Sequence, residues 1–464
     1  MKRKTSGRKR RLVRIVSLGC PKNFVDTEQA AASLFMHGFG IASTDDEADV
    51  MFINTCAFLA SAREEAAETL RYAENWKQAK PDRVIICGGC IVSWDRDGAF
   101  RRGFPAVDSW LPPACGHDLG GVIETALSSA DKAPVCAPDL DAARFQLTPR
   151  HYAWLRISDG CCNHCSYCLI PSIRGELRSR SMKSVVSEAD NLLRSGVKEL
   201  LVIAQDTAGY GMDFDGRSHL PELLKSLDSF SGDYLIRLMY LHPVHITREL
   251  IDAMCGTKHL VRCLEIPIQH VADGVLRRMN RHIGEKRQRA VLDELREKGF
   301  AIRTTLMTGF PGETEEDFRN LRRYVEEMKF ERLGVFAWSE EPGTPAAAMK
   351  GKVPGEERER RRDVLMTAQK KISRSLNRSL LGRECEVIVD RLLPGGEARG
   401  RTMLDVPGID NDVTVKGLPK KIRGHRGPIP GSRIFIRVEH AGIYGISGTY
   451  VPDRDPKKGN TEKA

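Results

Sequence analysis

The sequence of 464 residues predicts an α/β protein in three parts: an amino-terminal parallel βα domain, a (βα)6 partial barrel, and a small antiparallel β-barrel at the carboxyl end. The first two parts are predicted by two series in which apolar runs of strand length alternate with amphipathic helical segments. The third is predicted by short alternating strands between Gly and Pro turns. We expect a basic tail at 1–11, the amino-terminal domain at 12–128, a linker at 129–149, the partial barrel at 150–378, the β-barrel at 379–451 and a polar tail at 452–464.

In the amino-terminal domain, every predicted strand ends at a cysteine. The strands are Val13–Leu18, Asp49–Asn54 and Arg83–Ile86, helices are expected over Asp26–Met36 and Ala60–Lys77, and the cysteines are Cys20, Cys56 and Cys90. Because the carboxyl ends of parallel strands emerge at one edge of a sheet, the three thiols are expected to converge. A single free cysteine is more often a small buried hydrophobe, but three on equivalent turns favour a functional site. Cys87 is an alternative to Cys90, although the turn Gly88-Gly89 favours Cys90.

The second series predicts a partial TIM barrel of six βα units, whose chemistry belongs at the carboxyl ends of the strands. Its expected strands are Ala153–Ile157, Leu200–Ala204, Leu235–Tyr240, Cys263–Ile268, Ile302–Met307 and Leu333–Trp338.

A charged helix over Pro354–Leu380 leads to the third part, where an OB-like barrel is expected. Its strands are predicted at Cys385–Val389, Asp412–Val415, Arg433–Val438 and Gly445–Tyr450. Residues 381–450 hold 11 basic and 8 acidic side chains, a weaker excess than a dedicated RNA reader would carry. The basic loop from Lys416 to Arg426 still leaves RNA contact open.

Charge and cysteine content narrow the class of protein. Seven of the ten net positive charges lie within the first eleven residues, which either attract phosphates or form a solubilising extension. No apolar stretch of 18 residues occurs, and the start of the chain lacks an apolar signal core, so we expect neither a membrane contact nor secretion.

Thirteen cysteines, an odd total, argue against a fully paired disulfide framework and favour metal binding or thiol chemistry in a reducing, cytoplasmic compartment.

The most specific signal is the spacing C-x3-C-x2-C formed by Cys161, Cys165 and Cys168. Three thiolates on a short loop suit a four-iron cluster and leave one iron without a protein ligand. Such an iron can chelate S-adenosylmethionine and release a 5′-deoxyadenosyl radical from it. The alternatives are a structural zinc knuckle and a triad that uses Cys162 in place of Cys161; we favour Cys161.

This loop, continued by Leu169-Ile170-Pro171-Ser172-Ile173-Arg174-Gly175, resembles that of the radical-SAM methylthiotransferases. Cys20, Cys56 and Cys90 match that family's amino-terminal cysteines, and residues from about 380 to 450 are similar to its TRAM domain. The resemblance covers the chain except for its two tails. It implies two 4Fe-4S clusters, the second held by Cys20, Cys56 and Cys90. It also implies two molecules of S-adenosylmethionine, one as methyl donor and one as radical source.

Further motifs are similar to the subgroup that modifies the β-carbon of an aspartate in the small-subunit ribosomal protein of the S-twelve family. They lie at 17–26, 204–211, 237–243 and 406–410; members that act on transfer RNA usually carry Asn where this chain has Asp206-Thr207. The implied partners are that ribosomal protein, free or in its subunit, ribosomal RNA around it, and electron-donor and sulfur-donor proteins. The alternatives are the same chemistry on a hypermodified adenosine of tRNA, and a non-catalytic RNA-binding protein stabilised by metal.

The remaining candidates lie at turns after predicted strands. Gln205 and Asp206 are catalytic candidates, and the plainer interpretation of Asp206 is that it caps a turn. The resemblance places Gly309, Gly312 and Glu313 near S-adenosylmethionine, although such turns are also common for structural reasons. Tyr167 is expected beside the adenine, or else buried in the barrel. His270 and the six cysteines that match no ligand spacing are interpreted as structural; these are Cys87, Cys115, Cys136, Cys255, Cys263 and Cys385.

Overall fold

The computed structural model describes residues 10–128, 136–419, 421–422 and 425–452, and the chain forms two compact units. Unit 1 comprises Met1–Leu147, Ser158–Arg180 and Glu341–Thr344, and unit 2 comprises Thr148–Ile157, Ser181–Glu340 and Pro345–Ala464. Most of both predicted tails lies outside the described residues. The expected limits of the domains stay a prediction. The predicted α/β architecture, with a parallel sheet, a partial barrel and a closed β-barrel, is confirmed.

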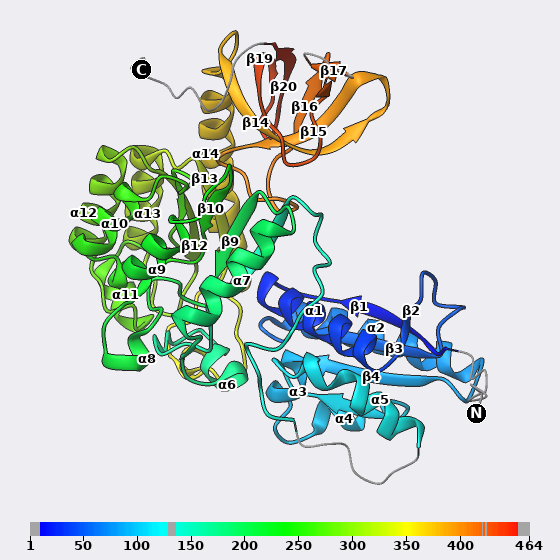
Figure 1. The fold of residues 1–464 in the computed structure, drawn as a ribbon. Helices are drawn as coiled ribbons and strands as arrows, with labels where there is room; N and C mark the ends of the chain where they lie inside the picture. The colour runs from blue at the N-terminus through cyan, green and yellow to red at the C-terminus, as the bar shows by residue number, and fades with distance from the viewer. Residues whose placement is uncertain (1–9, 129–135, 420, 423–424, 453–464) are drawn as a thin grey trace. The chain divides into compact units, whose positions relative to one another are not determined.

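Unit 1 is built on a parallel five-stranded sheet in the order β2-β1-β3-β4-β5 (Figure 1). Its strands are β1 (Leu12–Ser17), β2 (Gly40–Ile41), β3 (Val50–Thr55), β4 (Val84–Gly89) and β5 (Ser109–Leu111). Its helices are α1 (Pro21–Met36), α2 (Ala60–Gln78), α3 (Cys90–Trp94), α4 (Ala99–Arg102), the 3-10 turn η1 (Gly116–Asp118), α5 (Leu119–Leu127) and α6 (Ile170–Arg174). A two-residue ladder, β7 (Ser158–Asp159) with β8 (Arg178–Ser179), closes the segment that carries α6. The three predicted strands are confirmed.

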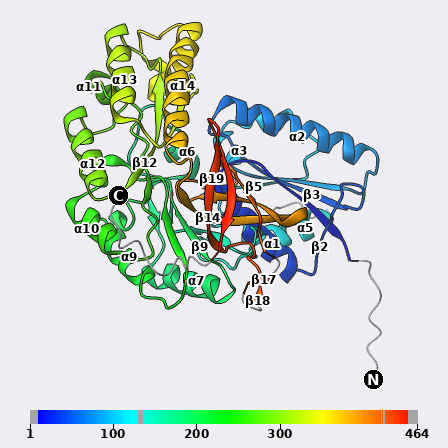
Figure 2. The ribbon, with the colours of Figure 1, turned by 90° about the horizontal axis from the view of Figure 1, so that it is seen from above.

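Both faces of this sheet are buried, which explains why its strands read as continuous apolar runs. Along β3, Val50 and Phe52 enter the core that α1 and α5 cover, whereas Met51 and Ile53 enter the core under α2 (Figure 2). Leu169 and Ile173 of the α6 segment join the second core. The loop predicted to hold a cluster is therefore packed onto the amino-terminal sheet.

The described part of the expected linker, residues 136–149, is fastened to unit 1 as far as Leu147. The buried carboxylate of Glu28 on α1 accepts hydrogen bonds from Arg144 and from the backbone N–H of Leu147. Cys136 forms a disulfide with Cys115, a pairing that the sequence did not predict. Both cysteines are structural here, as expected.

Unit 2 contains six parallel strands in two three-stranded halves, β10-β9-β6 and β11-β12-β13, with helices outside them (Figure 1). The strands are β6 (Tyr152–Arg156), β9 (Glu199–Ile203), β10 (Leu235–Leu238), β11 (Cys263–Glu265), β12 (Ala301–Thr308) and β13 (Arg332–Ala337), so all six predictions are confirmed. The helices are α7 (Met182–Arg194), α8 (Met212–Asp215), α9 (Leu220–Leu227), η2 (Pro243–His245), α10 (Arg248–Gly256), α11 (Asp273–Arg278), α12 (Glu285–Glu297), α13 (Glu315–Met328), η3 (Pro345–Ala348) and α14 (Gly355–Arg378).

After α14 the chain forms a closed barrel in the order β14-β15-β16-β20-β19. Its strands are β14 (Glu384–Leu393), β15 (Glu397–Thr402), β16 (Val413–Lys416), β19 (Arg433–Ala441) and β20 (Ile446–Val451), with the turn η4 (Pro394–Gly396) and a small ladder of β17 (Lys421–Ile422) and β18 (His425–Arg426). The pair β16–β20 is parallel and the other pairs are antiparallel. The sequence did not predict β15, because Ala398 is its one apolar side chain.

Buried ion pairs join this barrel to the amino ends of the unit 2 strands. The carboxylate of Glu199 lies 2.7 Å from Arg237 and 2.6 Å from Arg401, and these two cations hold its pKa below the usual range although burial alone would raise it. Asp410 of the 406–410 motif pairs with Arg303 on β12. This motif therefore closes one end of the partial barrel. Among the residues that the structure describes, none of the helices has both the length and the apolar character needed to cross a bilayer.

Candidate functional site

The sheet of unit 1 places Cys20, Cys56 and Cys90 at the carboxyl ends of three adjacent strands. Cys20 follows β1 at the start of α1, Cys56 follows β3, and Cys90 follows β4 as the first residue of α3. Each thiol is close enough to the other two to interact with them electrostatically. The structure thus brings together the three cysteines that the strand pattern predicted to converge.

Two glycines permit this close approach. Gly19 has φ +111°, and a Cβ there would lie 2.9 Å from the Cβ of Cys56. Gly89 has φ +94°, and a Cβ there would lie 2.4 Å from Asn54 Oδ1. A side chain at either position would both strain the backbone and push a cysteine-bearing turn away from its neighbour.

Buried amide side chains hold the turns in register. Asn23 Nδ2 donates to the carbonyls of Leu18 (2.9 Å) and Thr55 (2.8 Å), and Asn54 Nδ2 donates to the carbonyl of Asn23 (2.8 Å). Thr55 Oγ1 donates to the carbonyl of Gly88 at 2.6 Å. The polar residues at the start of α1 therefore fix the relative positions of the cysteine-bearing turns.

The chemistry of this donor set fits a metal cluster. Burial raises the pKa of the Cys56 thiol, and it raises that of Cys90 to about 12. Both thiols are therefore protonated when no metal is bound, whereas coordination removes the thiol proton and supplies a partner for the buried sulfur. Three thiols at one sheet edge match the three-cysteine ligand set expected from the sequence.

The second triad lies between β7 and α6, also in unit 1. The backbone N–H groups of Asn163 and Ile170 donate to the sulfurs of Cys161 (3.5 Å) and Cys168 (3.4 Å), and Cys165 is buried. Hydrogen bonds of this kind are typical of iron–sulfur loops, where they tune the cluster. Cys162 is exposed, which favours Cys161 as the ligand.

Two charged side chains near these cysteines received no role from the sequence. Arg174 is buried among Asn23, Asp26 and Asp159. Glu341 accepts from the N–H of Ala60 (3.1 Å) at the start of α2, a short way after Cys56, and pairs with Arg63 at 2.7 Å. Arg174 lies in the segment Leu169–Gly175, which matches the family loop but predicts no role for this side chain, and no local pattern in the sequence indicated Glu341.

Asp206 and Gln205 follow the end of β9 in unit 2. Asp206 is buried; its Oδ1 accepts from the backbone N–H groups of Ala208 (3.1 Å) and His242 (3.0 Å), and its Oδ2 lies 2.7 Å from His245 Nδ1. These contacts make Asp206 an anchor for the turns after β9 and β10. Gln205 is half-buried beside it.

The turn at 309–313 is braced by its own glutamate. Glu313 Oε2 accepts from the N–H of Gly309 (2.5 Å) and of Phe310 (3.2 Å), and Oε1 lies 2.9 Å from Arg361 Nη1. Burial raises the pKa of Glu313 despite Arg361, and it lowers the pKa of the adjacent His270 to about 3. A Cβ on Gly312 would lie 2.9 Å from the guanidinium of Arg278. Tyr167, in the other unit, is half-buried within the cysteine loop.

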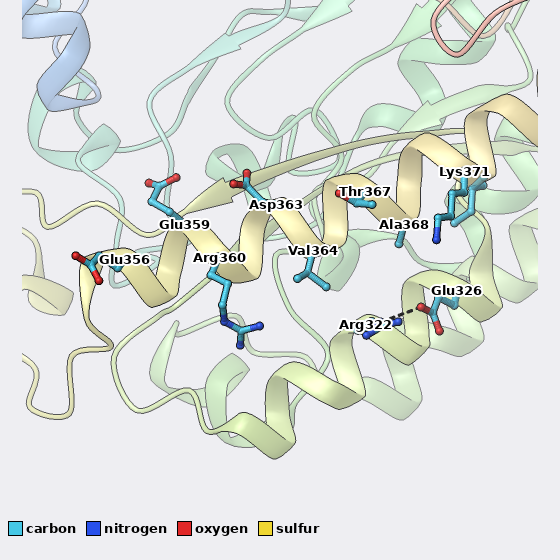
Figure 3. A pocket seen from close by; sticks show the side chains of 11 residues that line it. Arg322, Glu326, Glu356, Glu359, Arg360, Asp363, Val364, Thr367, Ala368 and Lys371 are labelled. Atoms are coloured by element: carbon cyan, nitrogen blue, oxygen red, sulfur yellow. Dashed lines mark hydrogen bonds and ion pairs between the residues drawn. The ribbon is translucent and has the colours of Figure 1, made fainter.

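A groove of about 1030 Å³ lies between α13 and α14 (Figure 3). Charged side chains of both signs line it around Val364, and Arg322 pairs with Glu326 at 2.9 Å. None of the predicted site residues is among its lining residues, so the groove is not part of the candidate site.

Two family models match the chain. Residues 12–111 match "Uncharacterized protein family UPF0004", and residues 155–325 match "Radical SAM superfamily". Among solved structures, the radical S-adenosylmethionine methyltransferase TsrM from Kitasatospora setae superposes with a TM-score of 0.56 at 15% identity, covering 73% of this chain and 74% of that one. At this identity the match supports the fold alone.

Curated relatives match nearly end to end. "Ribosomal protein uS12 methylthiotransferase RimO" from Heliobacterium modesticaldum is 36% identical over 95% of this chain and 95% of its own length. The protein of the same name from Elusimicrobium minutum is 39% identical over 94% of this chain and 98% of its own length. The chain therefore belongs to the RimO family of radical-SAM methylthiotransferases, enzymes that use S-adenosylmethionine and two 4Fe-4S clusters.

Proposed function

We propose that this chain attaches a methylthio group to the β-carbon of an aspartate in ribosomal protein uS12, using one S-adenosylmethionine as methyl donor and a second as radical source. The end-to-end similarity to relatives named for uS12 supports the substrate. The observation that carries the mechanism is that one compact unit contains two separate cysteine triads.

In this proposal Cys161, Cys165 and Cys168 hold the cluster that binds S-adenosylmethionine, and Cys20, Cys56 and Cys90 hold the auxiliary cluster. When bound, these groups supply a one-electron cleavage of the sulfonium and a sulfur that accepts a methyl group. Three thiolates in each triad leave one iron per cluster without a protein ligand.

The protein's own part is to hold the cysteine-bearing turns in place and to orient the cysteine sulfurs. Asn23 and Asn54 fix the turns that carry the auxiliary cysteines, and the N–H donors of Asn163 and Ile170 orient two sulfurs of the other triad. Packing of α6 onto α3 holds the two sets together within unit 1.

In unit 2, the residues that we propose to face substrate or S-adenosylmethionine lie at the carboxyl ends of strands. Gly309, Gly312 and Glu313 form a braced turn that binds S-adenosylmethionine in this proposal. Tyr167 of the cysteine loop in unit 1 is also proposed as a residue that binds S-adenosylmethionine. Asp206 positions His245. Gln205 is proposed to face the aspartate of the substrate uS12. We propose that electron-donor and sulfur-donor proteins serve the reaction and that ribosomal RNA contacts the basic loop from Lys416 to Arg426 and the basic amino-terminal tail, both of which lie partly outside the described residues. Because the substrate is a ribosomal protein, the site of action is the cytoplasm.

The test is to reconstitute the protein anaerobically and count iron and sulfide. It is then incubated with S-adenosylmethionine, dithionite and a sulfide source, with purified uS12, small ribosomal subunits or tRNA as substrate. We expect about eight irons per chain and, by mass spectrometry, a methylthio group on one aspartate of uS12. Modification of tRNA alone would instead support the adenosine alternative, and zinc without iron would support the non-catalytic one.

A further inference from the structure

Arg174 is the last residue of α6, six positions after Cys168, and its side chain is 1% exposed. A fully buried arginine is rare unless its charge is paired, because desolvation of a cation is costly. Its position at the end of the loop that carries one cysteine triad raises the question of what its guanidinium contacts.

The contacts lie on two segments that are distant in the sequence. Arg174 Nη1 donates to both carboxylate oxygens of Asp159, at 3.2 and 3.1 Å. Arg174 Nη2 donates to Asp26 Oδ2 at 2.9 Å and to Asn23 Oδ1 at 3.1 Å, both on α1. The planar fork therefore bridges α1, which directly follows Cys20, and the segment from Asp159 to Arg174 that carries the other triad, which we call the radical loop. Lysine cannot reproduce this geometry.

The same guanidinium lies within electrostatic range of the auxiliary cysteines. Its positive charge acts electrostatically on Cys20, Cys56 and Cys90. Burial lowers the pKa of Arg174, but Asp159 and Asp26 raise it, so that the net shift is upward. An arginine stays protonated in any case. A permanent positive charge thus lies near the proposed ligand set and is carried by the segment that also holds Cys161, Cys165 and Cys168.

We propose that Arg174 is a positioning residue for the auxiliary cluster, which fixes the radical loop against the auxiliary cysteines and raises the reduction potential of their cluster. This inference rests on the proposed function, since it takes Cys20, Cys56 and Cys90 as cluster ligands. The physical basis is that reduction adds negative charge to the cluster, and a nearby cation favours the reduced state.

The test uses a full-length background with Cys161→Ala, Cys165→Ala and Cys168→Ala, so that only the auxiliary cluster assembles. The midpoint potential is measured by a redox titration followed by electron paramagnetic resonance, and iron content is measured alongside. We expect Arg174→Gln to shift the midpoint to more negative values. Asp159→Asn, which removes a negative charge next to Arg174, is expected to shift it in the opposite direction.

The matched control is Arg83→Gln. Arg83 is buried in the same unit and stacks on Trp76, but it precedes the amino end of β4, opposite the end that carries Cys90. It should lower thermal stability without moving the potential. A midpoint in Arg174→Gln equal to that of Arg83→Gln, at full iron content, would overturn the role of Arg174.

If Arg174→Gln fails to fold, an unshifted Asp159→Asn overturns the proposal in its place. A background protein that assembles no cluster at all would instead refute the proposed function.

Discussion

Replacing Asn23 by Ala removes a side chain that connects two cysteine-bearing turns and the radical loop. Asn23 is 1% exposed and makes three hydrogen bonds, to the carbonyls of Leu18 and Thr55 and to Arg174. The alanine variant leaves both carbonyls and one arginine N–H without this partner. Because the turns of Cys20 and Cys56 lose their mutual tie, we expect weaker retention of the auxiliary cluster.

The size of the effect follows from the bonds that are lost. A neutral hydrogen bond contributes about 1 kcal/mol net, and one to a charged group about 1.5–3 kcal/mol. Two neutral bonds and one charge-assisted bond place the loss of stability of unit 1 at about 3–5 kcal/mol, before any relaxation. A loss of this size is a large fraction of the stability of an ordinary domain.

The assay compares Asn23→Ala with Asn377→Ala in protein reconstituted with iron and sulfide. Asn377 is also buried and donates to two carbonyls, those of Gly442 and Ile443 (each 3.0 Å), but it joins α14 to the carboxyl-terminal barrel in unit 2. Both variants should unfold at lower temperature, and only Asn23→Ala should lose iron faster to a chelator. Equal iron loss from the two variants would refute the reasoning that Asn23 acts on the cysteine turns.

Three further outcomes are expected. Cys161→Ala should abolish formation of 5′-deoxyadenosine, whereas Cys20→Ala should retain it and stop sulfur transfer; methylthiolation by Cys20→Ala at the wild-type rate would show that the triads do not divide the work as proposed. Burial lowers the pKa of His270 to about 3 from 6.5, so the unfolded chain binds more protons below pH 6.5 and stability falls as the pH drops. At pH 5.5 the loss is about 1.4 kcal/mol, and thermal melts of His270→Gln should show a shallower decline. Gly89→Ala should cost about 1–3 kcal/mol and reduce iron content, which a chelator assay and a melt would check; unchanged iron would contradict the clash with Asn54.

The strands could be predicted because burial on both sides of a sheet leaves a plain apolar run. The start of α1 could not: its helix was expected from Asp26, yet it begins at Pro21. The first turn contains Lys22 and Asn23, which are polar and buried beside the cysteine-bearing turns of the candidate site rather than in an apolar core. Local hydrophobic patterns do not predict the helix at such positions, because these residues serve the site rather than the packing of an apolar core. Strands β2 and β5, with two and three residues, are too short to show a period.

The convergence of the three amino-terminal cysteines could be predicted for a related reason, because each of them follows a recognisable strand. The partners of Arg174 could not be predicted, since Asp26 and Asp159 are separated from it by 148 and 15 residues and are selected only by the tertiary fold. Asp206 was expected at a strand end, and the structure adds its bond to His245, which no spacing in the sequence indicated.

The segment Ser158–Arg180 leaves the βα series that precedes and follows it and packs into unit 1. Leu169 and Ile173 enter the core under α2, Arg174 binds α1, and Glu341 anchors a second returning segment at the start of α2. Both cysteine triads therefore share one set of packing contacts. A substitution that loosens these contacts should uncouple cleavage of S-adenosylmethionine from sulfur transfer, because in the proposed mechanism cleavage needs one triad and transfer needs both. Glu341→Gln, which keeps the shape of the side chain but weakens its bond to Arg63, should raise the ratio of 5′-deoxyadenosine to methylthiolated product. An unchanged ratio in this variant would show that the returning segment does not control the coupling.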